Sequence, residues 1–71
     1  MSARSLATMS PADLCSALEW AEVSASYPAD MRQVLRDERQ SLAIALRSRD
    51  GAKIAAATAE AKRVARMWGL T

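Results

Sequence analysis

The sequence contains no histidine and a single cysteine, Cys15, among its 71 residues. One cysteine cannot form an intramolecular disulfide, and a zinc site needs Cys and His ligands that this chain does not supply. The sequence also has no glycine-rich phosphate loop and no paired-carboxylate motif, and so short a chain leaves little room for a cleft of about 300 Å³. We therefore expect no catalytic site, no metal site and no bound cofactor.

Glycine, proline and phenylalanine are also scarce, with two, two and no residues, whereas alanine accounts for 16 residues. This composition is typical of helices and not of sheets. The longest apolar run, residues 42–46, is far too short to cross a bilayer. Residues 1–11 have no apolar stretch that would suit a signal peptide. With the unpaired cysteine, these features predict a protein of the bacterial cytoplasm, or of the host cell cytoplasm if a phage encodes it.

A chain of 71 residues forms one domain at most. A domain near this size buries only about 60% of the surface that its unfolded chain exposes. Its core alone would supply about 3–5 kcal/mol of stability, and such domains commonly gain more from disulfides, metals or oligomerisation. Because the first two are not expected here, self-association or a partner protein is the predicted source of further stability.

Two similar segments mark the expected starts of helices. Ser10 can cap a helix, Pro11 suits the first helical position, and the Asp13 carboxylate can reach back to the first turn. Pro28 repeats this pattern 17 residues later, where it ends one helix and starts the next. The resulting prediction is a flexible tail over residues 1–9, a single helical domain over 10–71, and a first helix over about 11–25.

Two longer helical patterns follow, each with one apolar stripe at about 100° per residue. The first stripe consists of Met31, Val34, Leu35, Leu42, Ala45 and Leu46, and the second of Ile54, Ala57, Ala61, Val64, Ala65 and Trp68. Gly51, between them, is the type of residue that commonly follows a helix end. The sequence thus predicts an all-α fold with further helices over about 28–48 and 52–68. Their short link makes them an antiparallel hairpin, across which the first helix packs.

Several large apolar residues lie outside these stripes or at their ends. They are Trp20, Val23, Ile44, Met67 and Trp68. Scattered exposed apolar residues are normal, so one interpretation is that Trp20 covers the core edge and the others are incidental. However, Trp and Met are enriched at protein interfaces, and this chain has two and four of them. We therefore predict that these five residues contribute to a contact with a second copy or another protein.

Charge is unevenly distributed, with a net −3 over residues 1–30, +3 over 31–49 and +2 over 50–71. An acidic first helix beside two basic helices suits either internal pairing or contact between molecules. The basic residues form a row on the second helix, Arg32, Arg36, Arg39 and Arg47, and a shared face on the third, Lys62 and Arg66. Such a row is commonly a solvated flank; otherwise it is an electrostatic face for nucleic acid or for an acidic protein surface.

Two further residues need separate interpretation. Glu38 falls within the apolar stripe of the second helix, so its carboxylate must be paired or must reach solvent. The alternative to simple solvation is an ion pair with Arg49 of a second copy or with an arginine of a partner. Cys15 lies near the start of the first helix, where a thiol pKa can fall. Without a histidine to act as base, we expect it to be a small, partly buried residue.

These features favour a non-enzymatic regulatory or adaptor protein that binds proteins, as an inhibitor, an anti-activator or a co-chaperone. Its expected partners are a second copy, in a homodimer, and an unidentified protein with an acidic surface, and no membrane. The alternatives are a small DNA-binding regulator that uses the basic face, and a structural subunit of a phage or secretion assembly. In size and architecture over residues 11–70, the chain resembles small helical-hairpin co-chaperones and the short inhibitors of phages and plasmids, without a shared motif.

Overall fold

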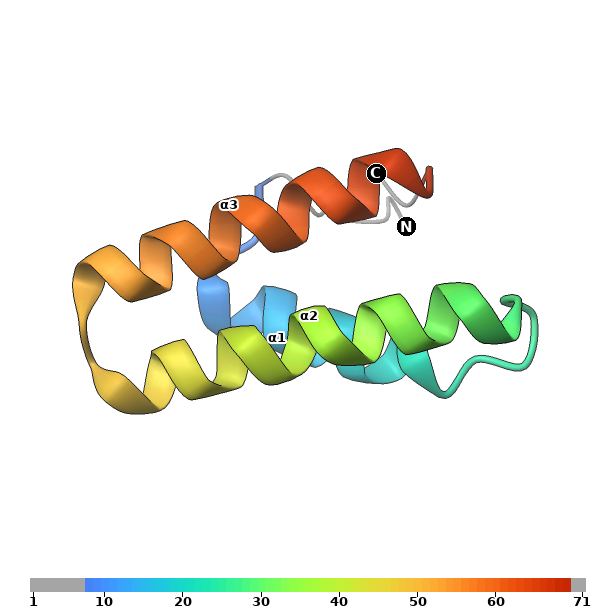
Figure 1. Ribbon diagram of the computed structural model, residues 1–71, viewed down its shortest axis with the longest axis horizontal. Coiled ribbons are helices and arrows are strands. Elements are labelled where there is room, and N and C mark those ends of the chain that lie inside the picture. The colour runs from blue at the N-terminus through green and yellow to red at the C-terminus, as the bar shows by residue number, and fades with distance from the viewer. Residues whose placement is uncertain (1–7, 70–71) are drawn as a thin grey trace.

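The computed structural model describes residues 8–69, which form three α-helices and no strand. α1 spans Pro11–Glu22, α2 spans Ala29–Ser48 and α3 spans Gly51–Met67. In Figure 1, α1 runs from left to right, α2 runs back from right to left, and α3 runs from left to right again. A short connection joins each helix to the next. The predicted all-α fold of three helices is therefore confirmed. Residues 1–7 of the predicted tail lie outside the described residues.

α1 begins as the sequence predicts but ends earlier. The Ser10 hydroxyl accepts a hydrogen bond from the backbone N–H of Asp13 at 3.3 Å, which caps the helix. The last helical residue is Glu22, whereas the sequence predicted an end near residue 25. The backbone N–H groups of Val23 and Ser24 donate to the carbonyls three residues earlier, those of Trp20 at 3.3 Å and Ala21 at 3.1 Å. Such bonds tighten the last turn and end the α-helical pattern.

The connection between α2 and α3 consists of Arg49 and Asp50. Arg49 adopts a left-handed conformation, with φ at 56°, and ends α2. The Asp50 side chain caps α3, because it accepts hydrogen bonds from the backbone N–H groups of Ala52 at 2.9 Å and Lys53 at 3.3 Å. Gly51 is the first residue of α3, which corrects its assignment to the turn. The two-residue link gives the predicted antiparallel hairpin of α2 and α3 (Figure 1).

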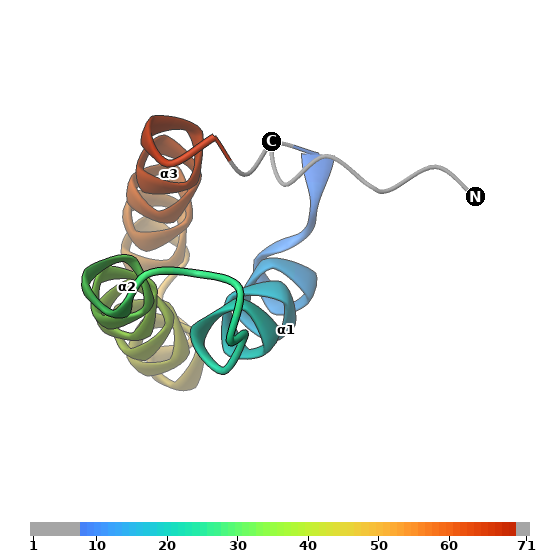
Figure 2. The ribbon, with the colours of Figure 1, turned by 90° about the vertical axis from the view of Figure 1, so that its right-hand side faces the viewer.

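The core lies mainly where α1 meets α2. Its buried side chains are Leu14, Leu18, Met31, Leu35, Leu42 and Ala61. α1 and α3 pack against different sides of α2 and hardly touch each other (Figure 2). The sequence predicted that α1 packs across the α2–α3 hairpin, and in the structure α1 packs mainly against α2. Because α1 and α3 do not close on each other, each presents a broad outer surface.

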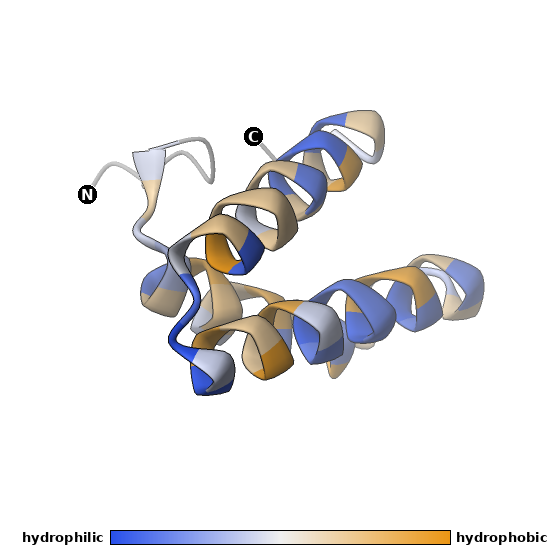
Figure 3. Cartoon of the chain, turned by 60° about the vertical axis from the view of Figure 1, so that its left-hand side comes forward, coloured by the Kyte–Doolittle hydropathy of each residue, from blue (hydrophilic) through white to orange (hydrophobic). Residues whose placement is uncertain are grey.

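The contact between α2 and α3 is built from smaller side chains. α3 buries Ala61, Val64 and Ala65, and small residues of this kind let two helix axes approach closely. Apolar and polar segments alternate along α2, as expected for an amphipathic helix (Figure 3). Trp68, which the sequence placed at the end of the α3 stripe, stays 38% exposed. Among the described residues, no helix has the length and the apolar character needed to span a bilayer.

Candidate interaction surface

The five predicted contact residues all stand at the surface. Their exposed fractions are 78% for Trp20, 67% for Val23, 66% for Ile44, 71% for Met67 and 38% for Trp68. None of them belongs to the core cluster. The exposed fraction of Trp20 disagrees with the interpretation that its ring covers the core edge. The five residues are distributed over all three helices and their ends, and their surroundings differ.

Trp20 and Val23 share a shallow depression on α1. Its volume is about 290 Å³, and its lining residues are Ser16, Glu19, Trp20 and Val23. These four positions follow the spacing i, i+3, i+4 and i+7, which places them on one side of a helix. Leu14 and Leu18 occupy the buried side and hold α1 against α2. We refer to Ser16, Glu19, Trp20 and Val23 as the α1 outer face.

Ile44 lies apart from this depression. It follows the buried Leu35 by nine residues, which corresponds to about 180° around α2. The same side of α2 carries Gln33 and Asp37, joined by a hydrogen bond of 3.2 Å between the Gln33 amide and the Asp37 carboxylate. Ile44 is therefore an isolated apolar residue on the polar side of α2.

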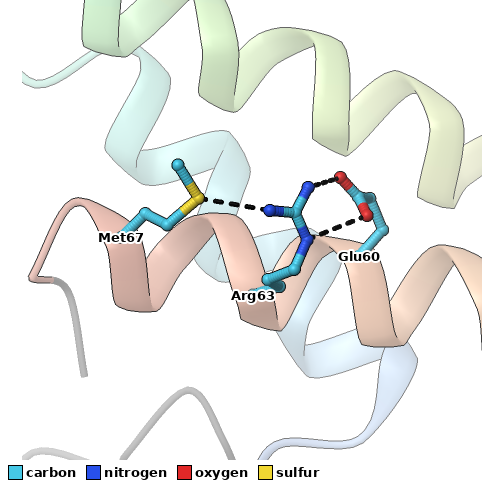
Figure 4. Close-up of polar contacts among 3 residues, drawn as sticks. All are labelled: Glu60, Arg63 and Met67. Atoms are coloured by element: carbon cyan, nitrogen blue, oxygen red, sulfur yellow. Dashed lines mark hydrogen bonds and ion pairs between the residues drawn. The ribbon is translucent and has the colours of Figure 1, made fainter.

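Met67 lies at the end of α3 beside a charged pair. Arg63 donates two hydrogen bonds to the Glu60 carboxylate, one of them from Nε at 3.2 Å, and a third from Nη1 to the Met67 sulfur at 3.3 Å (Figure 4). The Arg63 charge is thus engaged within α3. The third bond turns the Met67 thioether toward Arg63 along the surface of α3 (Figure 4).

The predicted arginine row of α2 separates into different environments. Arg39 reaches α1, where its Nε lies 2.5 Å from a Glu22 carboxylate oxygen. This hydrogen bond raises the pKa of Arg39. Arg32 is half-buried, and its buried Nε has no hydrogen-bond partner among the described residues. Arg36 and Arg47 are exposed. The Glu22–Arg39 pair is an instance of the internal pairing that the acidic first helix and basic second helix allow.

The predicted basic face of α3 consists of a half-buried Lys62 and an exposed Arg66. Arg66 lies in the last turn of α3, where a cation interacts favourably with the helix dipole. It forms no ion pair with any other described residue. Arg66 therefore presents a positive charge without an ion pair in the described part of the chain, within the same helical turn as the exposed Met67.

Glu38 lies half-buried on α2, near the Glu60–Arg63 pair of α3. Burial raises the pKa of Glu38, the Glu60 carboxylate raises it further, and the Arg63 guanidinium opposes both. No ion pair of Glu38 occurs among the described residues. Within one copy, this carboxylate is thus influenced by an arginine of α3. The sequence favoured a solvated carboxylate, and an ion pair with Arg49 of a second copy or with a partner's arginine stays a prediction.

Cys15 packs, half-buried, against the core cluster. Burial raises the pKa of its thiol, the carboxylates of Glu19 and Glu22 contribute in the same direction, and the Arg39 charge opposes them. A raised pKa disfavours the thiolate, which is the nucleophilic form. The expectation of a small, partly buried residue agrees with this position.

The described residues hold no group of three or more His, Cys, Asp or Glu side chains that could bind a metal ion. A comparison with protein family models, curated proteins and solved structures found no match for this chain. The function of the candidate surface therefore has to be inferred from the residues of this chain alone.

Sequence reasoning identified Trp20 and Val23 but missed the two polar residues of the depression, Ser16 and Glu19. The signal was present in the spacing of these four positions, which equals that of an apolar stripe. It was overlooked because Ser16 and Glu19 are ordinary residues for a solvated helix side.

Proposed function

We propose that this chain is a small regulatory or adaptor protein that acts by protein–protein binding and forms a homodimer. The α1 outer face is its main contact surface. The observation that carries the proposal is the position of Trp20 and Val23, which are largely exposed and line one depression while the core is built without them.

The free energy gained when apolar surface is buried supports this proposal. An aromatic side chain such as Trp20 buries about 150–250 Å² when it is covered. At about 25 cal/mol per Å², covering the exposed 78% of this side chain would contribute roughly 3–5 kcal/mol. Large aromatic residues that stay exposed next to a concave surface are typical anchors of protein interfaces. A partner that covers Trp20 would also supply the stability that a core of this size lacks.

The substitution Trp20→Asp tests the proposal. Because Trp20 contributes nothing to the core, we expect helicity by circular dichroism to stay unchanged while self-association, measured by sedimentation equilibrium, is lost. Ile44→Asp is the matched control, since it introduces the same charge at a residue of similar exposure outside the depression. The control should associate like the wild type. The proposal fails if Trp20→Asp unfolds the monomer, or if it associates as well as the control does.

The candidate roles are those of an inhibitor, an anti-activator or a co-chaperone, in a bacterial cytoplasm or in the host cell of a phage. Each role requires a second protein that recognises the same surface. Affinity capture with the wild type, with Trp20→Asp and with Ile44→Asp, compared by quantitative mass spectrometry, identifies this protein. A partner that uses the α1 outer face should be enriched by the wild type and by Ile44→Asp, and depleted with Trp20→Asp.

A DNA-binding role finds less support in the basic residues. Arg39 pairs with Glu22 and Arg32 is half-buried, so the row on α2 offers only Arg36 and Arg47 as exposed cations. Nucleic-acid affinity that depends on phosphate contacts falls steeply between about 50 and 200 mM salt. We expect no binding to duplex DNA by fluorescence anisotropy even at the lower of these salt concentrations. Salt-sensitive binding there would favour the DNA-binding alternative.

A further inference from the structure

α1 and α3 carry opposite charges that do not pair with each other within one copy. α1 carries acidic residues and no basic one, whereas basic residues outnumber the single acidic residue of α3. Opposite charges on two helices commonly pair within a bundle. Here α1 and α3 pack on different sides of α2 and hardly touch (Figure 2). The charge of α1 is therefore not neutralised by α3 of the same copy.

The ion pairs among the described residues leave further charges without an ion pair, Glu19 on α1 and Lys53, Lys62 and Arg66 on α3. Glu22 is bound to Arg39, and Glu60 to Arg63. Glu19 is exposed on the α1 outer face and forms no ion pair with the other described residues. Arg66, near the end of α3, is in the same situation. Glu19 lines the same depression as Trp20. Besides the hydrogen bond to Glu22, the Glu19 carboxylate also raises the pKa of Arg39. Arg66 precedes the exposed Met67 in the last turn of α3.

The lining of the depression suits a side chain that is mainly apolar. Its volume of about 290 Å³ is near the lower end of the range of small-molecule sites, about 300–1,000 Å³. The lining includes the Trp20 indole ring and the Glu19 carboxylate. An unbranched thioether such as that of Met67 adapts to shallow apolar surfaces and makes favourable contacts with aromatic rings. A cation on the same helix end as this thioether could then form an ion pair with Glu19.

We propose that the α1 outer face of one copy receives the end of α3 of a second copy. Met67 packs against Trp20 and Val23, and Arg66 pairs with Glu19. A two-fold symmetric dimer forms this contact twice, because each copy offers one surface of each kind. The inference rests on the proposed homodimer and specifies which surfaces meet in it.

Charge reversal distinguishes this arrangement from other dimers. In Glu19→Arg two arginines oppose each other, and in Arg66→Glu two glutamates do. Like charges in a contact are strongly unfavourable, so we expect each variant alone to self-associate at least about tenfold more weakly than the wild type. An equal mixture of the two variants restores both contacts, one as the native pair and one as the reversed pair. Native mass spectrometry should therefore detect a heterodimer that forms as tightly as the wild-type homodimer.

The doubly substituted chain, Glu19→Arg with Arg66→Glu, provides a second test and should recover self-association. Arg36→Glu is the control, since it reverses an exposed charge on α2 and should associate like the wild type. Circular dichroism establishes that every variant is folded. If Trp20→Asp abolishes association but neither the mixture nor the double variant recovers it, the α1–α3 contact is wrong and the proposed function stands. A wild type that stays monomeric at all concentrations overturns this contact as well.

Discussion

α1 and α3 both pack on α2, but they do so with different side chains. Leucines dominate the buried contact between α1 and α2, and the Glu22–Arg39 ion pair closes its edge. Alanines dominate the buried side of α3, where Glu38 of α2 adds a half-buried carboxylate. The difference indicates that large side chains hold α1 in place, whereas α3 is held by the close approach of small ones.

The surfaces that the two helices leave exposed differ as well. α1 presents a depression with an indole ring and a free carboxylate, and α3 presents a thioether beside a free guanidinium. Because the firmly held helix carries the concave surface, that surface can stay in shape without a partner. A preformed surface loses less entropy on binding than a mobile one does.

The largest expected effect comes from the α1–α2 contact. Leu18 is 1% exposed, and Leu18→Ala should lower the free energy of unfolding by about 2–5 kcal/mol, since it removes buried apolar contacts and leaves a cavity. This loss is close to the whole stability that a core of this size supplies. Leu18→Met, which nearly conserves volume, should cost less than about 1.5 kcal/mol. Urea denaturation followed by circular dichroism gives both values. A loss below about 1 kcal/mol for Leu18→Ala would contradict the anchoring of α1 by leucines.

A smaller loss is expected where α3 approaches α2. Ala61 is fully buried, so Ala61→Leu would force the two helices apart and should cost about 1–3 kcal/mol. Ala59→Leu introduces the same side chain at an exposed position of α3 and should change stability by no more than about 0.5 kcal/mol. Thermal unfolding of the two variants compares them directly. Equal stability of both would mean that the small size of Ala61 is not what holds α3.

The smallest effect concerns Glu38. Because its pKa is raised in the folded chain, the folded state binds this proton more readily than the unfolded state does. The stabilisation is present at acidic pH and is lost as the pH rises through the raised pKa. Glu38→Gln mimics the protonated form and should raise the free energy of unfolding at pH 7 by less than about 1 kcal/mol, since the carboxylate is only partly buried.

Urea denaturation of Glu38→Gln at several pH values measures this effect, and the variant should also lose part of the pH dependence of stability. Asp37→Asn is the control, because it removes a carboxylate charge from the neighbouring exposed position and leaves an oxygen to accept the bond from Gln33. If Glu38→Gln is less stable than the wild type at pH 7, attraction to Arg63 outweighs burial.

The sequence predicted the helices well because their local signals agree with the packing. Ser10 caps α1, and the apolar stripe of α2 is the side that enters the core. The end of α1 was not predictable from periodicity, since it is set by backbone bonds from Val23 and Ser24 to carbonyls three residues earlier. The left-handed turn at Arg49 was also missed, because an arginine rarely adopts that conformation and glycine is the usual signal.

The candidate surface was only partly predictable. Trp20 and Val23 were identified because they deviate from the apolar stripe of their helix. A helical wheel gives the direction of a side chain but not the neighbour that it meets, which is why the bond from Arg39 to Glu22 was not assigned. A helical wheel also could not show that Ile44 lies apart from Trp20. The distance between these two residues depends on how α1 and α2 pack together.

Trp20 is exposed in the single chain and should become covered when a second chain binds. In a Trp68→Phe variant, Trp20 is the only tryptophan, so acrylamide quenching of its fluorescence can be followed over a range of protein concentrations. We expect strong quenching in dilute solution and protection at the concentrations where the dimer forms. Protection already in dilute monomer, or equal quenching at every concentration, would show that Trp20 is not the contact residue.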